Sequence, residues 1–478
     1  MAIKSNRDYI ETLEKTGDVV RIKDEVDWDL EAGAITRRTC ERQGPAVLFE
    51  NVKDYPGKRI FGAPLSSYRR LATAMGLNVN TPLGKIHEEF EKRFENRIKP
   101  TEVKSGPCKE NIITGEKINL FDFPAPMAHD GDGGRYIGTW HVIVSRHPDT
   151  GWHNWGMYRV AVHNKRHVGC QMVVTSDMGR IFYEKYVPQG KPMPVAIAIG
   201  IDPISSLTGM LPVGFGVNES EVSGGLRTEP VEIIKAETSE LLVPAEAEII
   251  LEGEMLIDEL LYEGPFGEYT GYRASPRRPM PVIRINCITH RNNPIVTTSN
   301  MGIPVDDSAL GSSFGFTYVL KKWLKQAKIP VKDLYVPPEG VGHLVVVSVP
   351  RANKYSLMAV QISDLISSVS GLPGVPSTTI VVDDDIDVFN INEVLHALVT
   401  KCHPLNGITA IKAPGIPLVP FLSIEDRLWS KSGRVVFDCT WPPDWPPEAI
   451  PTRGSFRDIY PKEVQDEVEK NWGKWGLS

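Results

Sequence analysis

The hydrophobic pattern of the chain changes twice, and this limits the folds open to it. From about residue 135 to 300, alternating runs rich in β-branched residues are separated by turn residues, which is typical of a β-barrel or sandwich. On both sides of that segment, apolar strands alternate with helical patterns, which indicates α/β structure. The central segment is expected to contain strands at 138–146, 156–164, 194–201, 246–255, 281–290 and 294–299.

The flanking segments carry clear helix and strand signals. Ser5 and Asn6 open a helical pattern that Gly17 closes, as N-terminal capping residues and a terminal glycine commonly do. In the last third, apolar strands separated by helices predict a parallel sheet covered on both faces. The expected elements outside the central segment are strands at 18–22, 46–52, 342–349 and 378–388, and helices at 5–17, 29–44, 66–76, 82–95, 315–328, 356–371, 391–401 and 461–476.

The chain of 478 residues is too long for one ordinary core, so more than one domain is expected. We predict an N-terminal α/β domain (1–125), a central β-barrel domain (126–312) and a C-terminal α/β domain (313–478) that ends in an amphipathic helix. That last helix has an apolar stripe suited either to another subunit or to its own domain.

Charge and composition exclude several classes of protein. The formal net charge is -7, which argues against a nucleic-acid surface. No apolar run is long enough to predict a membrane span, and the polar start lacks a signal-peptide core, so a cytoplasmic protein is expected. The six cysteines are scattered without a CxxC pair, which favours reduced structural thiols over zinc or disulfides.

The stretch "EGPFGE" holds Glu263 and Glu268 on either side of a proline-glycine turn. Two carboxylates that share a poorly hydrated site cannot both ionise freely, so one can serve as a general acid. From spacing alone, a solvated turn is the favoured interpretation of this stretch. Upstream, Asn154 and Arg159 flank "WGMY". An arginine that enters a buried strand needs an anionic partner, and Glu263 or a phosphate could supply it.

Other motifs give weaker signals. The glycines of "DGDGGRYIG" (130–138) do not fit the spacing of a dinucleotide-binding loop. The acidic run "VVDDDIDV" (381–388) could bind a metal, but a solvated acidic turn is the better interpretation. His141, His153 and His163 lie in no metal-binding spacing and are expected to be structural.

Taken together, several segments resemble the UbiD family of reversible decarboxylases, which use prenylated FMN. The resemblance runs from about residue 20 to the C-terminus. Its pieces are "DGGRYIGTWHVIVSR", "NWGMYR", "VNESEVSGGLR", "VPAEAEIILEGE", "EGPFGEYTGY", "LYVPPEG", "VVDDDIDV" and "TKCHPL". It implies a carboxy-lyase with a central split β-barrel that binds the flavin, and a C-terminal domain through which the protein assembles into a homodimer or homohexamer.

The resemblance also implies roles for individual residues. Arg159, Glu263 and Glu268 would form a Glu–Arg–Glu network, with Glu268 as proton donor and Arg159 as the group that orients the substrate carboxylate. A divalent metal, usually Mn²⁺, would bridge the flavin phosphate to the protein beside a K⁺ ion. The implied cofactor contacts are Asn154, Trp155, Gly156, Met157, Tyr158, Arg159, Met210, Glu219 and Lys401.

Among these contacts, Asn154 and Glu219 match metal ligands, and the carbonyls of Trp155 and Met210 match K⁺ ligands. The chain departs from the family at the third metal ligand. The family usually supplies a histidine 16 to 18 residues after the arginine, whereas this segment reads "GCQMVVTSDMGRIF". Thr175, Ser176, Asp177 or Met178 occupies that place, and Asp177 offers the hard oxygen ligand that Mn²⁺ or Mg²⁺ prefers.

The expected substrate is an aromatic or heteroaromatic carboxylic acid, which would lose CO₂ reversibly, and a UbiX-type prenyltransferase would supply the cofactor. Met157, Tyr158 and residues from 297–307 and 416–421 are candidates for the substrate pocket. A decarboxylase of cinnamate-like acids and an FMN oxidoreductase on the same barrel are alternatives. A retaining glycosidase would also use two carboxylates, and a non-catalytic assembly protein would give no reason for the network.

Overall fold

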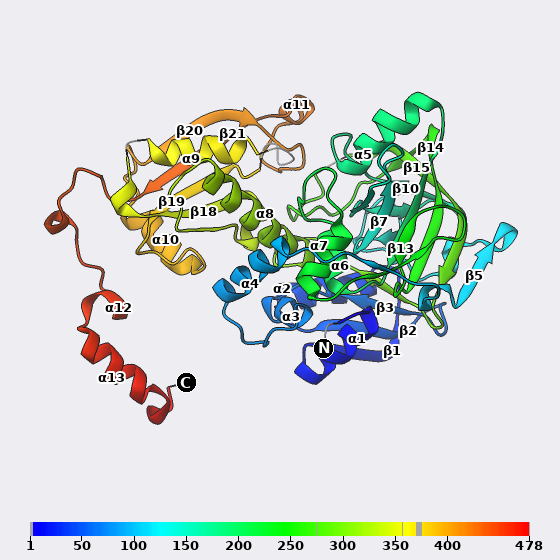
Figure 1. The fold of residues 1–478 in the computed structure, drawn as a ribbon, viewed down its shortest axis with the longest axis horizontal. Coiled ribbons are helices and arrows are strands. Elements are labelled where there is room, and N and C mark those ends of the chain that lie inside the picture. Colours follow the sequence, from blue (N-terminus) through cyan, green and yellow to red (C-terminus); the bar gives the residue numbers. More distant parts are fainter. Residues whose placement is uncertain (1–2, 275, 356, 370–374, 478) are drawn as a thin grey trace.

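Among the described residues, four sheets of unequal size organise the chain, the smallest in the order β13-β12-β4, and Figure 1 shows the fold as a computed structural model. The structure describes residues 3–274, 276–355, 357–369 and 375–477. Two larger bodies stand out: the N-terminal and central segments together form one, and the C-terminal segment forms the other (Figure 1). Within the described residues, no helix combines the length and apolarity that crossing a membrane requires.

The N-terminal segment builds a four-stranded sheet in the order β1-β2-β3-β16. The Ser5 side chain accepts a hydrogen bond from the Asp8 N–H at the start of α1, and Gly17 ends that helix with φ +73°, so the predicted caps are confirmed. The elements of this segment are α1 Asn6–Thr16, β1 Val19–Val26, α2 Glu31–Glu41, β2 Ala46–Val52, β3 Arg59–Gly62, α3 Tyr68–Ala74, α4 Leu83–Glu95, β4 Thr101–Glu102 and β5 Asn111–Thr114.

The central segment forms a sheet that curls into a half-barrel. Its strand order is β6-β9-β10-β15-β14-β11-β7-β8, and β5 adds to β15. Fully buried aliphatic side chains such as Ile143, Ile197 and Leu251 pack together in one hydrophobic cluster on this sheet. The elements are β6 Tyr136–Gly138, β7 His141–Arg146, β8 His153–Gly156, β9 Val160–Val162, β10 His167–Cys170, α5 Asp177–Ile181, β11 Met193–Ile199, α6 Pro203–Thr208, α7 Glu219–Arg227, β12 Glu232–Lys235, β13 Leu242–Pro244, β14 Ile249–Glu263, β15 Arg278–His290 and β16 Ile295–Thr298.

One strand of the central pattern belongs to another sheet. The run at 294–299 was expected among the central strands, but β16 pairs in parallel with β3, with Val296 opposite Ile60. Every residue of β16 is buried, so its apolar pattern predicts a buried strand without indicating which sheet takes it. The pairing ties the end of the barrel segment to the N-terminal sheet. The domain boundaries stay predictions.

The C-terminal segment confirms the expected α/β pattern. Its sheet has the order β17-β18-β19-β21-β20; β18, β19 and β21 are parallel, and the two edge strands are antiparallel. The elements are α8 Asp307–Gln326, β17 Asp333–Tyr335, β18 Leu344–Val349, α9 Met358–Ser367, β19 Thr378–Asp383, α10 Ile391–Thr400, β20 Ile408–Pro414, α11 Ile424–Leu428, β21 Lys431–Cys439, α12 Phe456–Ile459 and α13 Lys462–Trp472.

The terminal helix α13 stands away from the rest of the chain (Figure 1), and none of its residues is buried. Large apolar side chains on and around it are exposed, among them Val464, Trp472 and Trp475. The sequence left open whether this helix packs on its own domain or on another subunit. In the part of the chain that the structure describes, it does not pack on its own domain.

An aromatic cluster joins the N-terminal helix α4 to the C-terminal segment. His87 of α4 stacks on Phe314 of α8 with ring centroids 3.9 Å apart, and it also meets Tyr335 and Phe389. His87 is buried, and this burial, with a smaller contribution from the charge of Lys321, lowers its pKa to about 3. The ring is therefore neutral in the folded protein near pH 7.

This burial predicts acid sensitivity. Because the folded-state pKa lies below the ordinary value of 6.5, the unfolded state binds more protons below pH 6.5, and the free energy of unfolding falls there by roughly 1.4 kcal/mol per pH unit for this group. The loss is expected as the pH drops from 6.5 towards 3. Thermal melts at several pH values should show a weaker acid dependence for His87→Phe than for the wild type; identical dependences would contradict this.

Candidate active site

One arginine lies between the two glutamates singled out in the sequence. Arg159 donates from Nε and Nη2 to the two carboxylate oxygens of Glu263 at 2.7 and 2.8 Å, and from Nη1 to Glu268 Oε1 at 2.6 Å. The side chains of the three residues are at most 9% exposed. The solvated-turn alternative therefore does not hold, because both glutamates are buried against a shared guanidinium.

The turn between the glutamates sets their positions. Glu263 is the last residue of β14, and Gly264 then adopts φ +83°, a conformation that favours glycine. Phe266 is fully buried and lies under the guanidinium, with Arg159 Cζ 5.0 Å from its ring centroid. The backbone N–H of Glu268 donates to the Tyr272 carbonyl at 3.2 Å. The turn thus returns the second carboxylate to the same arginine.

A tyrosine completes the shell around Glu263. Tyr136 of β6 donates its hydroxyl proton to Glu263 Oε1 at 2.6 Å. Burial and the neighbouring Glu263 raise the pKa of Tyr136. Burial by itself would lower the pKa of Arg159, but the hydrogen bond to Glu263 and the charges of Glu268 and Glu263 raise it overall. Arg159 is therefore a permanent cation in this site.

The arrangement has acid–base capacity. One guanidinium charge faces two carboxylates, so a single added proton makes the cluster neutral. Glu263 accepts three hydrogen bonds, one from Tyr136 and two from Arg159, and Glu268 accepts one from Nη1 of the same arginine, so both carboxyl groups are held on one guanidinium.

A second acidic cluster lies beside Asn154, at the other end of the "NWGMYR" motif that carries Arg159. Glu219, the first residue of α7, accepts hydrogen bonds from Asn154 Nδ2 at 3.0 Å and from the Trp155 N–H at 2.9 Å. Burial, with a smaller contribution from the charge of Asp177, raises the pKa of Glu219 to about 8 despite these donors. Burial also raises the pKa of Asp177. The negative charge of Asp177 thus acts on the buried Glu219, and Asp177 is itself partly buried.

These residues fit a divalent cation. The buried carboxylate of Glu219, the partly buried carboxylate of Asp177 and the side-chain amide of Asn154 offer the hard oxygen ligands that Mn²⁺ and Mg²⁺ prefer, and a cation would relieve the repulsion between the acids. Among the described residues, no three His, Cys, Asp or Glu side chains gather into a metal site by themselves. The amide, a backbone carbonyl or a ligand oxygen would therefore have to complete the coordination.

The remaining residues of "NWGMYR" connect the two clusters. Trp155 is buried, and the Tyr158 ring lies so close to Gly156 that a Cβ there would be 2.2 Å from Cε2 of the ring. The Met157 N–H donates to the Gly209 carbonyl at 2.7 Å, next to Met210. All predicted site residues from Asn154 to Arg159, together with Met210, Glu219 and Asp177, thus belong to the central segment around β8.

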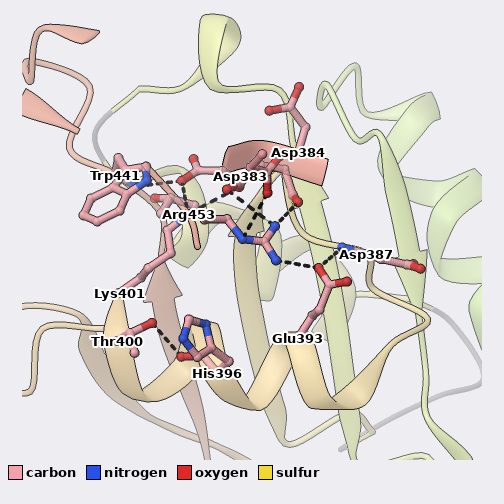
Figure 2. A network of polar contacts seen from close by, with 12 residues as sticks. Asp383, Asp384, Asp387, Glu393, His396, Thr400, Lys401, Trp441 and Arg453 are labelled. Atoms are coloured by element: carbon pink, nitrogen blue, oxygen red, sulfur yellow. Dashed lines mark hydrogen bonds and ion pairs between the residues drawn. The ribbon is translucent and has the colours of Figure 1, made fainter. Parts of the chain in front are cut away.

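Lys401 lies in a different place. Its ammonium contacts Asp383 Oδ2 at 2.7 Å and Asp385 Oδ1 at 3.5 Å, and stands 4.9 Å from the Trp441 ring. Figure 2 shows this network at the end of β19, with Arg453 beside it. Asp383 is therefore not a cation site, because Lys401 neutralises that buried carboxylate. The expected turn follows the strand, with Asp384 and Asp385 partly exposed and Asp387 exposed, so the prediction of a solvated acidic turn is wrong for Asp383 only. The structure does not bring Lys401 to Arg159.

The candidate substrate-pocket segments lie near the glutamates. Met301 packs against the cluster of Tyr136, Ala161 and Phe266, and Thr270 Oγ1 donates to the Leu418 carbonyl at 3.3 Å. The sequence interpretation missed Tyr136 and the loop before it, because the glycines of "DGDGGRYIG" were considered only for phosphate binding.

Of the histidines singled out in the sequence, His153 accepts a hydrogen bond from the Leu242 N–H, and His141 is fully buried.

Comparison with known proteins agrees with this geometry. Three family models of 3-octaprenyl-4-hydroxybenzoate carboxy-lyase match: the N-terminal domain at residues 10–90, the Rift-related domain at 99–304 and the C-terminal domain at 317–439. Pyrrole-2-carboxylic acid decarboxylase of Pseudomonas aeruginosa is 32% identical, with 98% of each chain covered.

Solved structures are similar over the same length. Vanillic acid decarboxylase of Sedimentibacter hydroxybenzoicus in its open form superposes with a TM-score of 0.88 at 29% identity, with 100% of both chains covered. The UbiD-class enzyme HmfF from Pelotomaculum thermopropionicum, in complex with FMN, gives 0.83 at 29% identity, with 94% of this chain and 97% of that one covered. The chain therefore belongs to the UbiD family and is a carboxy-lyase of the decarboxylase type.

Proposed function

We propose that the chain decarboxylates an aromatic or heteroaromatic carboxylic acid, reversibly, with prenylated FMN as its cofactor and Glu268 as the proton donor. The observation that carries the proposal is the buried sharing of Arg159 between Glu263 and Glu268. In this arrangement the two acids have different roles. Glu263 fixes the guanidinium, and Glu268 moves the proton.

The chain's own residues then act in sequence. Arg159 orients the substrate carboxylate, and the apolar surroundings of Phe266 and Met301 favour loss of neutral CO₂ over a retained carboxylate. The bond from the ring carbon to the carboxyl carbon breaks. Glu268 delivers its proton to that ring carbon and is reprotonated from solvent before the next turnover. Read backwards, the same steps describe carboxylation.

The cofactor supplies what these side chains lack. Prenylated FMN, when bound, would provide the electron sink that accepts the electron pair left on an aryl or vinyl carbon when CO₂ departs. The residues proposed to hold it are those from Asn154 to Arg159, with Met210 and Glu219. Asn154, Glu219 and Asp177 would hold Mn²⁺, and the carbonyls of Trp155 and Met210 would hold K⁺. Contact between Lys401 and the cofactor stays a prediction, since it requires Lys401 to leave Asp383.

The substrate class follows from the relatives and from the apolar surroundings of the glutamates. The relatives named above act on pyrrole-2-carboxylic and vanillic acids, so we propose a flat aromatic acid. A cinnamate-like acid is the alternative. Release of CO₂ from a panel of pyrrole-2-carboxylic, vanillic and cinnamic acids separates these, and an FMN oxidoreductase would release none. We place the enzyme in the cytoplasm with a UbiX-type prenyltransferase as cofactor source.

Glu268→Gln tests the proton donor. The amide keeps the size of the side chain but has no acidic proton, so turnover of the panel acids and deuterium incorporation from D₂O should both fall by at least about 100-fold, while the visible spectrum of the bound flavin is retained. Glu116→Gln, at a fully exposed side chain, is the matched control. Full activity of Glu268→Gln would overturn the assignment.

The unusual third metal ligand is tested at Asp177. We expect Asp177→Ala to lower the Mn²⁺ content, measured by metal analysis after dialysis at a fixed Mn²⁺ concentration, by about 10-fold or more. Asp177→His should keep the metal, since imidazole also binds Mn²⁺. Glu184→Ala, at an exposed neighbour, is the control. Unchanged metal content in Asp177→Ala would show that other oxygens bind the metal.

The exposed terminal helix favours a homodimer or homohexamer. A chain that ends at Gly454 would lose α12, α13 and their exposed aromatic side chains, which a second subunit would otherwise cover. Light scattering should then report a smaller assembly than for the full chain. An unchanged mass would assign the interface to another surface.

A further inference from the structure

The loop at 129–134, which precedes β6, wraps around the turn that carries both glutamates. The Gly133 N–H donates to the Pro265 carbonyl at 2.7 Å, and Asp132 Oδ1 accepts from the Gly267 N–H at 3.0 Å. The approach is so close that a Cβ on Gly133 would lie 2.0 Å from the Gly264 carbonyl oxygen. The loop and the turn are thus held together as one unit, and no step of the mechanism above uses the loop.

A histidine–aspartate pair anchors this unit. His129 Nδ1 lies 2.9 Å from Asp132 Oδ2, and His129 Nε2 lies 2.9 Å from the Met301 carbonyl oxygen. A carbonyl oxygen can only accept, so His129 Nε2 donates to Met301, and Nδ1 is paired with the Asp132 carboxyl group. The Asp132 side chain is fully buried, and both of its oxygens are engaged. Burial alone would lower the pKa of His129, but Asp132 raises it overall.

The pair reaches Glu268 through one peptide. Asp132 fixes the N–H of Gly267, and the next residue is Glu268, whose own N–H donates to the Tyr272 carbonyl. The His129 ring also occupies the space beside Gly267, where a Cβ would lie 2.5 Å from Cε1 of the ring. From these contacts we infer that His129 and Asp132 are positioning residues that set where the Glu268 carboxyl stands relative to Arg159 and the reacting carbon.

This inference rests on the proposed role of Glu268. Removing the Asp132 side chain leaves the Gly267 N–H without its acceptor and lets the turn relax. A displacement of about 1 Å at the proton donor is enough to slow a reaction by roughly 100-fold. Substrate binding should change little, because Arg159 keeps its two hydrogen bonds to Glu263. The expected signature is a lower kcat with a nearly unchanged KM.

Two substitutions at one position separate positioning from a general structural role. Asp132→Ala removes all the hydrogen bonds of this side chain. Asp132→Asn can keep them: its Oδ1 still accepts from Gly267, while its amide donates to Nδ1 of a neutral His129 whose Nε2–H still faces Met301. We expect kcat for the most reactive panel acid to fall about 100-fold in Asp132→Ala and to recover to within about 10-fold of the wild type in Asp132→Asn.

A readout without cofactor or substrate accompanies the kinetics. In crystal structures of the cofactor-free variants, the 2.6 Å contact between Arg159 Nη1 and Glu268 Oε1 should be lost in Asp132→Ala and retained in Asp132→Asn. Should Asp132→Ala not fold, Gly267→Ala gives the same test, because its methyl group displaces the His129 ring or the turn.

The outcomes are distinct. Equal loss of kcat in the Ala and Asn variants, or an intact Arg159–Glu268 contact in Asp132→Ala or Gly267→Ala, would overturn the inference. Unchanged turnover in Asp132→Ala beside an inactive Glu268→Gln would also overturn it. An active Glu268→Gln would instead overturn the proposed function, while the cofactor-free structures would still decide whether the pair positions Glu268.

Discussion

The shared guanidinium of Arg159 is the interaction on which the rest of the site depends. Glu263 and Glu268 are both buried, and burying two carboxylates is unfavourable unless a cation lies between them. The structure meets this condition with three hydrogen bonds from one side chain. Everything that holds this arginine in place, including the Phe266 ring beneath it, therefore also controls the separation of the two acids.

The topology explains why six consecutive residues serve both clusters. In the sheet order, β8 is one edge strand, whereas β9 lies next to the opposite edge, beside β6. The short connection from Gly156 to Val160 therefore crosses the open seam of the half-barrel. Asn154 is left at the acidic cluster with Glu219, and Arg159 is delivered to Glu263. An irregular, glycine-containing segment suits this crossing because its residues do not belong to the strand at either edge of the sheet.

Sequence reasoning predicted many elements well and failed where a choice between partners was needed. The caps of α1 and the alternation of the C-terminal sheet follow from local pattern, so they were predictable. The pairing of β16 with β3 was not, because a uniformly buried strand fits any sheet. Asp383 was expected in a solvated turn, but Lys401 neutralises it inside the protein. Ion pairs between segments far apart in the chain cannot be predicted from the spacing of residues within one segment.

By itself, the sequence determined the order of strand-rich and α/β segments, the residue types Glu–Arg–Glu, and the family through its motifs. Local pattern suffices for these, because periodicity and capping act over a few residues. Only the tertiary structure decided that Arg159 lies between both glutamates, that the charge of Asp177 acts on Glu219, and that the loop around Asp132 is hydrogen-bonded to the turn before Glu268. These are contacts between segments far apart in the chain, and folding brings them together through the curl of one sheet.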